Sequence, residues 1–358
     1  MRSLRSNTVL LLLCVVARAG AQSKGGALSC ATCHPQQAVP QPETSMARAL
    51  TLGGVNKSLQ ARPKLTFHKG LYTYTVETTG KQSIYSVTDG TNTISAPIQW
   101  AFGAGTQTWV LELNSRMYES FVSYYEPIHA LDITMGDQDL QPKTLLEAFG
   151  REITSHESAA CFGCHSTGAV TEGTLHLSSM EPGVTCEHCH VGAREHQQAV
   201  SHGKLQSVPP KLKRLSSEEL SNFCGQCHRS FETVVEMRLL GPVNVRFQPY
   251  RLANSKCFDG SDARISCIAC HDPHREVVRE TAAYDSKCLA CHASDATPRV
   301  RLTASFHQPA TVPKAKACPV AKSDCASCHM PTTTLPGSHM IFHDHHIRIV
   351  RPHEPYPN

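Results

Sequence analysis

The stretch Cys161-Phe-Gly-Cys164-His165 contains the pattern that dominates this 358-residue chain, two cysteines three positions apart with a histidine directly after the second. The pattern occurs seven times and includes fourteen of the seventeen cysteines. The other copies are Cys30-Ala-Thr-Cys33-His34, Cys186-Glu-His-Cys189-His190, Cys224-Gly-Gln-Cys227-His228, Cys267-Ile-Ala-Cys270-His271, Cys288-Leu-Ala-Cys291-His292 and Cys325-Ala-Ser-Cys328-His329. Six copies lie within residues 161–329, which leaves few residues per motif for a side-chain core.

This spacing is the attachment signature of c-type haem. Two thiols three positions apart add to the two vinyl groups of one porphyrin, and the next residue, histidine, lies beneath the iron as its proximal ligand. A zinc site closes with four ligands and a redox Cys-x-x-Cys pair acts alone, so neither needs a histidine after every second cysteine. The sequence therefore predicts seven covalently attached haems, with the seven motif histidines as proximal ligands.

The other fourteen of the 21 histidines supply candidates for the second, distal axial ligand of each iron. The favoured candidates lie near the motifs and are His156, His176, His196, His274, His307, His343 and His346. His343 and His346 are three positions apart and would share a face on one helical turn. Met46 is an alternative ligand for the first haem, where it would raise the reduction potential, although packing on the porphyrin explains it equally well. Each iron can thus have two histidine ligands.

The N-terminus is typical of an export signal. Arg2 and Arg5 precede the apolar run 9–16, and Ala21 offers a cleavage point after it. The apolar run is shorter than the roughly 20 residues that a membrane span needs, so the mature chain is expected to have no span and to be periplasmic or extracellular. Without the signal the chain has 31 basic and 30 acidic residues, which argues against a nucleic-acid partner.

The motif spacing divides the chain into four parts. These are a signal peptide (1–21), a segment for the first haem (22–60), a β-rich region without motifs (61–150) and a multihaem domain (151–358). In the β-rich region the runs 71–76 and 83–88 alternate as half-buried strands do, and turn residues separate them. We predict a five- or six-stranded antiparallel meander over residues 65–125, including a hairpin formed by 109–113 and 116–125.

Helices in the multihaem domain are expected to be short. Ser216 reads as an N-cap with acidic residues in the first turn, and it predicts a helix that continues into the fourth motif. The tail from Pro331 is expected to be irregular and held against haem. The predicted fold class is α+β with much irregular structure, in which a β-rich N-terminal region precedes a haem-cored, short-helix domain.

Three cysteines lie outside the motifs. Cys14 belongs to the signal, whereas Cys257 and Cys318 remain in the mature chain. An oxidising compartment favours a disulfide between them, and two buried free thiols are the alternative.

Several motifs resemble those of multihaem cytochromes related to the tetrahaem cytochrome of bacterial ammonia oxidation. The resemblance is carried by residues 181–190 with His196, by 223–228, by 267–274, and by 325–331 with a downstream His-Asp-His. It covers about residues 155–350 and implies bis-histidine haems in close pairs, with His196 and His274 at positions that often supply distal ligands. The β-rich region lies outside it.

Three functions fit this sequence. The favoured one is an electron carrier between redox partner proteins, because electron transfer through haems needs no catalytic side chain. The second is a multihaem oxidoreductase acting on a small nitrogen or sulfur compound. Some such enzymes mark the active haem with Lys in place of the motif histidine, and no Cys-x-x-Cys-Lys occurs here, which makes this function less favoured. The third is a subunit of a haem filament.

Overall fold

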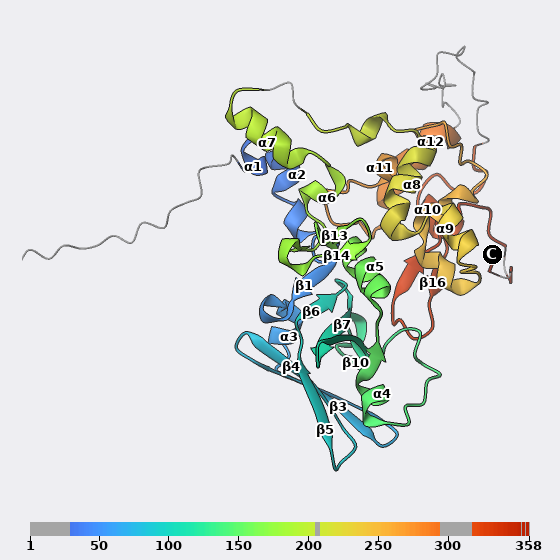
Figure 1. Ribbon diagram of the computed structural model, residues 1–358. Helices are drawn as coiled ribbons and strands as arrows, with labels where there is room; N and C mark the ends of the chain where they lie inside the picture. The colour runs from blue at the N-terminus through green and yellow to red at the C-terminus, as the bar shows by residue number, and fades with distance from the viewer. Residues whose placement is uncertain (1–28, 205–207, 294–316, 352, 355, 358) are drawn as a thin grey trace, which may run out of the picture.

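The computed structural model describes residues 29–204, 208–293, 317–351, 353–354 and 356–357. The expected signal peptide, Cys14 and the candidate ligand His307 lie outside these residues. Strands dominate the first half of the chain and short helices the second, as Figure 1 shows. The predicted α+β class with a β-rich N-terminal region is confirmed.

The β-rich region consists of two antiparallel sheets rather than one. The four-stranded sheet has the order β2 (Lys64–Lys69), β3 (Tyr72–Thr79), β4 (Gln82–Thr88) and β5 (Thr93–Pro97). The seven-stranded sheet follows the order β1 (Leu50–Leu52), β6 (Trp100–Phe102), β7 (Thr106–Leu113), β8 (Arg116–Ser120) and β11 (Gly150–Glu152), with β9 (Val122–Tyr125) beside β7 and β10 (Ala130–Ile133) beside β9.

The prediction of a single meander with five or six strands was therefore wrong in number and in pairing. Eight strands, β2 to β9, lie between Lys64 and Tyr125, and the chain changes sheets after β5. Pro97 ends β5 at the edge of the first sheet, where the lack of a backbone donor is tolerated. Residue alternation marks strands locally, but it does not reveal which strands pair across a change of sheet.

The predicted turns are confirmed. Gly80, with φ +59°, lies between β3 and β4. Asn114 and Ser115 join β7 to β8, and both have positive φ values of 51° and 62°. Two consecutive residues of positive φ match the right-handed twist of a hairpin, and Asn tolerates this conformation better than most residues.

A large aromatic core fills the space between the two sheets. Tyr85 of β4 packs against Trp109 of β7 at 5.7 Å between ring centroids, and against Phe149 of α4 (Leu145–Phe149) at 5.3 Å. All three side chains are fully buried. The Tyr85 hydroxyl donates a hydrogen bond to the Phe149 carbonyl, so its polar end is satisfied inside the core. Both sheets and α4 thus share one core.

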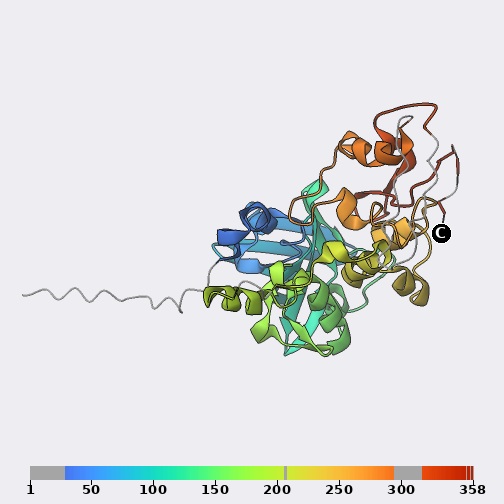
Figure 2. The same cartoon turned by 90° about the horizontal axis from the view of Figure 1, so that it is seen from above.

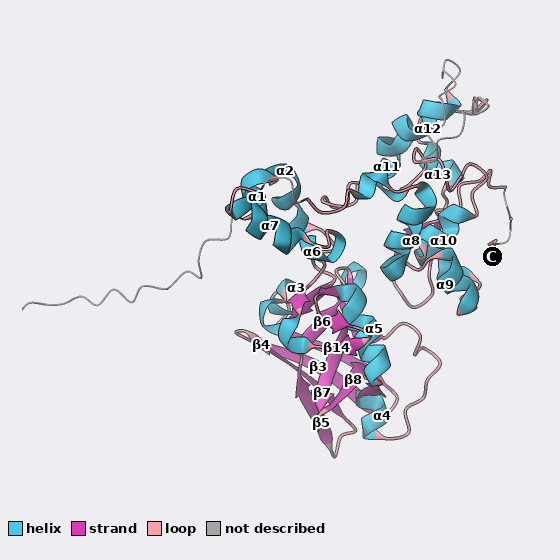
Figure 3. Ribbon diagram, turned by 45° about the horizontal axis from the view of Figure 1, so that its top comes forward, coloured by secondary structure: helices cyan, strands magenta, loops and turns pink. Residues whose placement is uncertain are grey.

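The helices are short, and most of them lie in the second half of the chain. Besides α4 they are α1 (Cys30–Cys33), α2 (Pro35–Ala38), α3 (Lys57–Gln60), α5 (Ser155–His165), α6 (Cys186–Cys189), α7 (Ala193–Ser201), α8 (Ser217–His228), α9 (Phe231–Glu236), α10 (Gln248–Ala253), α11 (Cys267–Cys270), α12 (Asp285–His292) and α13 (Cys325–His329). Figure 3 shows α1, α2, α6 and α7 gathered on one side of the molecule, and α8 to α13 on the other. Within the described part of the chain, no helix has the length and apolar character of a bilayer span.

Small two-stranded pairs complete the second half. They are β12 (Ser166–Thr167) with β15 (Glu181–Pro182), β13 (Val170–Thr171) with β14 (Thr174–Leu175), and β16 (Thr332–Thr334) with β17 (Ile341–His343). The last pair corrects the prediction of an irregular tail, because three consecutive threonines favour extended structure. The view from above in Figure 2 shows this tail lying among the helices of the second half.

Candidate haem sites

Every motif forms a helical turn. The first, third and fifth motifs form α1, α6 and α11, each of which ends at the second cysteine of its motif. The second, fourth, sixth and seventh motifs form the C-terminal ends of α5, α8, α12 and α13, which each end at the motif histidine. Residues three apart on a helix share a face, so both thiols of a motif are presented to the same side.

The two longest motif helices begin with capping boxes. Thr154 caps α5 and Ser216 caps α8, and each exchanges hydrogen bonds with a glutamate three residues later. In the first box, hydrogen bonds from the Thr154 backbone and from Arg151 lower the pKa of Glu157 to about 2. The helix predicted from Ser216 into the fourth motif is confirmed. These caps fix where each helix starts and therefore which way its motif faces.

Thiols of different motifs lie against one another. Four pairs of interacting thiols link motifs that are separated in the sequence: Cys30 with Cys186, Cys164 with Cys227, Cys224 with Cys267, and Cys288 with Cys325. In the second pair the interaction with Cys227 lowers the pKa of Cys164. The attachment points of neighbouring motifs are therefore adjacent in space.

Electrostatic interactions between other motif thiols link these pairs into one array. Cys189 of the third motif interacts electrostatically with both cysteines of the fourth, and Cys270 of the fifth interacts with Cys288 of the sixth. Asp285, at the start of α12, accepts hydrogen bonds from the backbone N–H groups of Asp324 and Cys325 at 2.6 and 2.8 Å. All seven motifs are thus connected, in the spatial order one, three, four, five, six, seven, with the second motif beside the fourth.

Two pairs of histidine rings lie close together, and each pair contains one motif histidine. His190 and His274 lie 6.0 Å apart with ring planes 8° apart, and His271 and His345 lie 6.2 Å apart at 42°. Two imidazoles on one metal, with metal–nitrogen distances of about 2.0–2.1 Å and about 1.1 Å from nitrogen to ring centre, have centroids roughly 6 Å apart. Both centroid separations therefore match that of two imidazoles on one metal, and each pair contains a motif histidine.

Hydrogen bonds set the orientation of several of these rings. Nδ1 of His165 lies 2.9 Å from the Ala49 carbonyl oxygen, and Nδ1 of His329 lies 2.8 Å from that of Arg348. Nδ1 of His345 lies 3.0 Å from the His343 carbonyl oxygen. A carbonyl only accepts, so Nδ1 must carry the proton, and Nε2 keeps the lone pair that binds a metal. Burial lowers the pKa of His345 to about 4, which keeps its ring neutral.

The predicted distal candidates differ in their placement. His274 faces the third motif histidine, as described above, whereas His156 and His176 are exposed and His196 is half-buried on α7. His343 lies at the end of β17, and the residues after it are not helical, so the helical face that His343 and His346 were expected to share is absent. His343 lies instead in β17, which pairs with β16. Sequence reasoning did not select His345, because its spacing from any motif is unremarkable.

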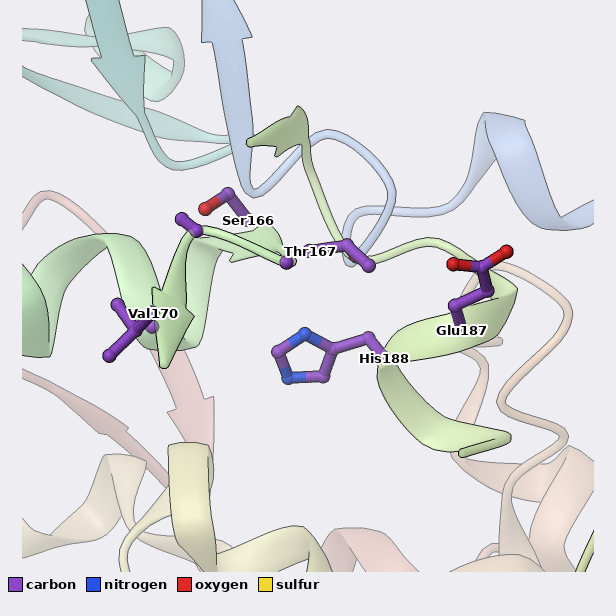
Figure 4. A pocket seen from close by; sticks show the side chains of 8 residues that line it. Ser166, Thr167, Val170, Glu187 and His188 are labelled. Atoms are coloured by element: carbon purple, nitrogen blue, oxygen red, sulfur yellow. The ribbon is translucent and has the colours of Figure 1, made fainter. Parts of the chain in front are cut away.

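His188, inside the third motif, turns away from its own thiols. Its ring extends from α6 into a cavity of about 280 Å³ that is also lined by Gly163, residues 166–170 and Glu187 (Figure 4). Its Nε2 lies 3.9 Å from Sγ of Cys227 in the fourth motif. Desolvation lowers the pKa of His188, so the side chain is a neutral bridge between the second, third and fourth motifs. Met46, proposed for the first motif, is half-buried.

The favoured disulfide between Cys257 and Cys318 is not formed, and both thiols are free and exposed. Cys257 lies near Cys288 and Cys291 of the sixth motif. Cys318 instead accepts hydrogen bonds from the backbone N–H groups of Val320 and Ala321, which lower its pKa. The two thiols are thus engaged with different parts of the chain.

Comparisons with known proteins point to c-type cytochromes over part of the chain. The model of the family described as cytochrome c554 and c-prime matches residues 120–191, which contain the second and third motifs. The match is narrower than the predicted resemblance over 155–350, and it begins inside the β-rich region that was expected to lie outside. No curated protein matches the chain. A crystal structure of the outer cell wall cytochrome OcwA is similar at 13% identity and a TM-score of 0.48, covering 90% of this chain and 78% of that chain.

Proposed function

We propose that the chain is an exported heptahaem c-type cytochrome that transfers electrons between redox partner proteins. The observation that carries this proposal is the continuous array formed by seven complete attachment motifs. The family match at the second and third motifs supports the cytochrome class. The predicted export signal supports a periplasmic or extracellular location.

The protein's own groups hold and orient the redox centres. Each motif supplies two thiols for thioether bonds and one imidazole for the iron, and the facing pairs His190–His274 and His271–His345 supply a second imidazole. Bound haem iron provides a centre that gains and releases one electron, at a potential set by its axial ligands and burial. Helix caps and Nδ1 hydrogen bonds fix the imidazoles before any ligand binds.

A small apolar core in the second half also supports bound haem. Among the described residues there, the buried apolar cluster is small: it consists of Val234, Phe247 and Tyr250, with Leu239 packed against it. The core between the two sheets is far larger. A stretch with this little buried side-chain surface needs another source of apolar burial, and porphyrin rings supply it.

The spatial order of the motifs defines a route. Its two ends are the first motif, where Cys30 and Cys33 are exposed, and the seventh, where Cys328 is exposed. These ends lie on opposite sides of the helical part of the molecule (Figure 3). We assign them as the places where electrons enter and leave. The second motif, on α5 against the larger sheet, forms a side branch at the fourth.

The haem content tests this proposal directly. Protein made with a competent cytochrome c maturation system is expected to carry seven haems per chain, read by intact mass and by the pyridine haemochrome assay. A Cys224→Ala and Cys227→Ala double variant is expected to lose one haem, while Cys257→Ser keeps all seven. Fewer than six haems in the unaltered protein would refute the heptahaem assignment.

The close packing of the motifs predicts a broad redox titration. Each electron adds negative charge near the next site, and charges at short range in a partly buried array interact strongly, so each reduction makes the next harder. Proton uptake by propionates and histidines should follow, so midpoints are expected to fall as pH rises from 6 to 8. We expect the titration to extend well beyond the about 110 mV that one Nernst curve covers at 59 mV per tenfold change. A single sharp curve that ignores pH would contradict it.

A further inference from the structure

We infer that His345 is the distal ligand of the fifth haem and that the buried ion pair between Arg251 and Asp344 positions it. The inference rests on the proposed function. Its first support is geometric: the His345 and His271 rings have centroids 6.2 Å apart, and the Nε2 of His345 is left free by the hydrogen bond of its Nδ1 to the His343 carbonyl. Of the described tail histidines, His345 is the one whose ring faces a motif histidine.

The residue before His345 is anchored at a fully buried site. Arg251 of α10 donates to both oxygens of Asp344, from Nε to Oδ1 and from Nη2 to Oδ2, each at 2.8 Å. Both side chains have no exposed surface. The parallel two-bond geometry fixes the orientation of the carboxylate as well as its position. Arg348 adds a bond from Nη1 to Oδ2 at 2.6 Å.

The residues on either side of the carboxylate are held as well. The Asp344 backbone N–H donates to the Pro331 carbonyl at 2.9 Å. Ser255, two residues after α10, donates from its hydroxyl to the His345 carbonyl at 3.1 Å and accepts from the Ile347 N–H at 2.8 Å. His345 is therefore clamped from both sides onto α10 and the residue beyond it, with its ring directed at the fifth motif.

A buried ion pair is weak evidence for stability by itself, since removing two charges from water is costly. Its value here is specificity. Asp344 lies between two other histidines, His343 and His346, and a shift of the tail by one or two residues would bring the wrong ring to the iron. The ion pair sets this register. His343 lies on the strand that pairs with β16, and its Nδ1 is 3.0 Å from the Met330 carbonyl oxygen.

The test uses the fully loaded protein and counts low-spin ferric haems by EPR and electronic absorption. His345→Ala is expected to convert one haem in seven to high spin while the mass still shows seven haems. His68→Ala, at an exposed position in β2, is the matched control and should leave all seven low-spin. Seven low-spin haems in His345→Ala, or the loss appearing instead in His346→Ala, would overturn the assignment.

Two further variants separate ligation and positioning from folding. His345→Met should keep the haem low-spin and raise one of the seven midpoints, because methionine ligation raises the potential. Asp344→Asn should alter the EPR signal of that same haem, which a merely structural role would not do, and Asp344→Glu should partly restore it. Unchanged midpoints in His345→Met would refute the ligand assignment. Loss of haem from the unaltered protein would refute the proposed function instead.

Discussion

Replacing Arg251 by methionine is expected to lower the free energy of unfolding by about 3–5 kcal/mol, because it leaves the buried carboxylate of Asp344 without its main partner. Both side chains are fully buried, so water cannot compensate for the lost charge. Arg251 also donates to the Pro357 carbonyl at 2.7 Å and to Asn244 at 3.3 Å, and both of these hydrogen bonds would be lost too. Urea unfolding followed by far-ultraviolet circular dichroism would measure the loss.

The matched control is Arg116→Met. Arg116 pairs with Glu152 at 3.0 Å between β8 and β11, but its side chain is 64% exposed. Exposed ion pairs contribute at most about 1 kcal/mol, so this variant should unfold almost like the unaltered protein. Equal losses in the two variants would show that the Arg251 pair is not buried in solution.

Replacing Phe162 by alanine is expected to cost about 3–5 kcal/mol, the range for truncating a buried aromatic side chain. Phe162 lies within the second motif and is fully buried. Its ring makes edge-on contacts with Trp100 at 5.3 Å and with Phe102 at 5.0 Å, both on β6. It therefore fastens α5, and with it the second haem site, to the larger sheet.

Phe231→Ala is the control for this variant. Phe231 begins α9, is 43% exposed and stacks on Tyr250 at 5.4 Å. An aromatic pair at the surface contributes about 0.5–1.5 kcal/mol, so the expected loss is about 1 kcal/mol. Thermal unfolding of both variants with intact haem content gives the comparison. A Phe162 variant that unfolds no earlier than the Phe231 variant would contradict the anchoring role.

Features set by neighbouring residues were predictable from the sequence. The attachment motifs, the capped helix from Ser216 and the hairpin at Asn114 and Ser115 all depend on interactions within a few positions. The division of the strands into two sheets was not predictable, because it depends on which short strands meet after the chain passes Pro97.

The same distinction applies to the candidate distal histidines. His274 follows the fifth motif closely and was selected, although it pairs with the histidine of the third. In our inference, the choice among the tail histidines depends on Arg251, which is 93 positions from Asp344 in the chain. Likewise, the residues next to Cys257 and Cys318 in the sequence do not show that the two thiols lie beside different parts of the chain. Long-range contacts of this kind leave no mark in local spacing.

The position of the fourth motif has a consequence for how the array tolerates damage. Its cysteines lie beside those of the second, third and fifth motifs. If electrons follow these contacts, the fourth site is a junction, and its loss would leave the third motif linked to the fifth only through the His190–His274 pair and to the second only through His188. Loss of the second site would leave every other site connected. The second site can therefore hold an electron without interrupting electron transfer among the other six.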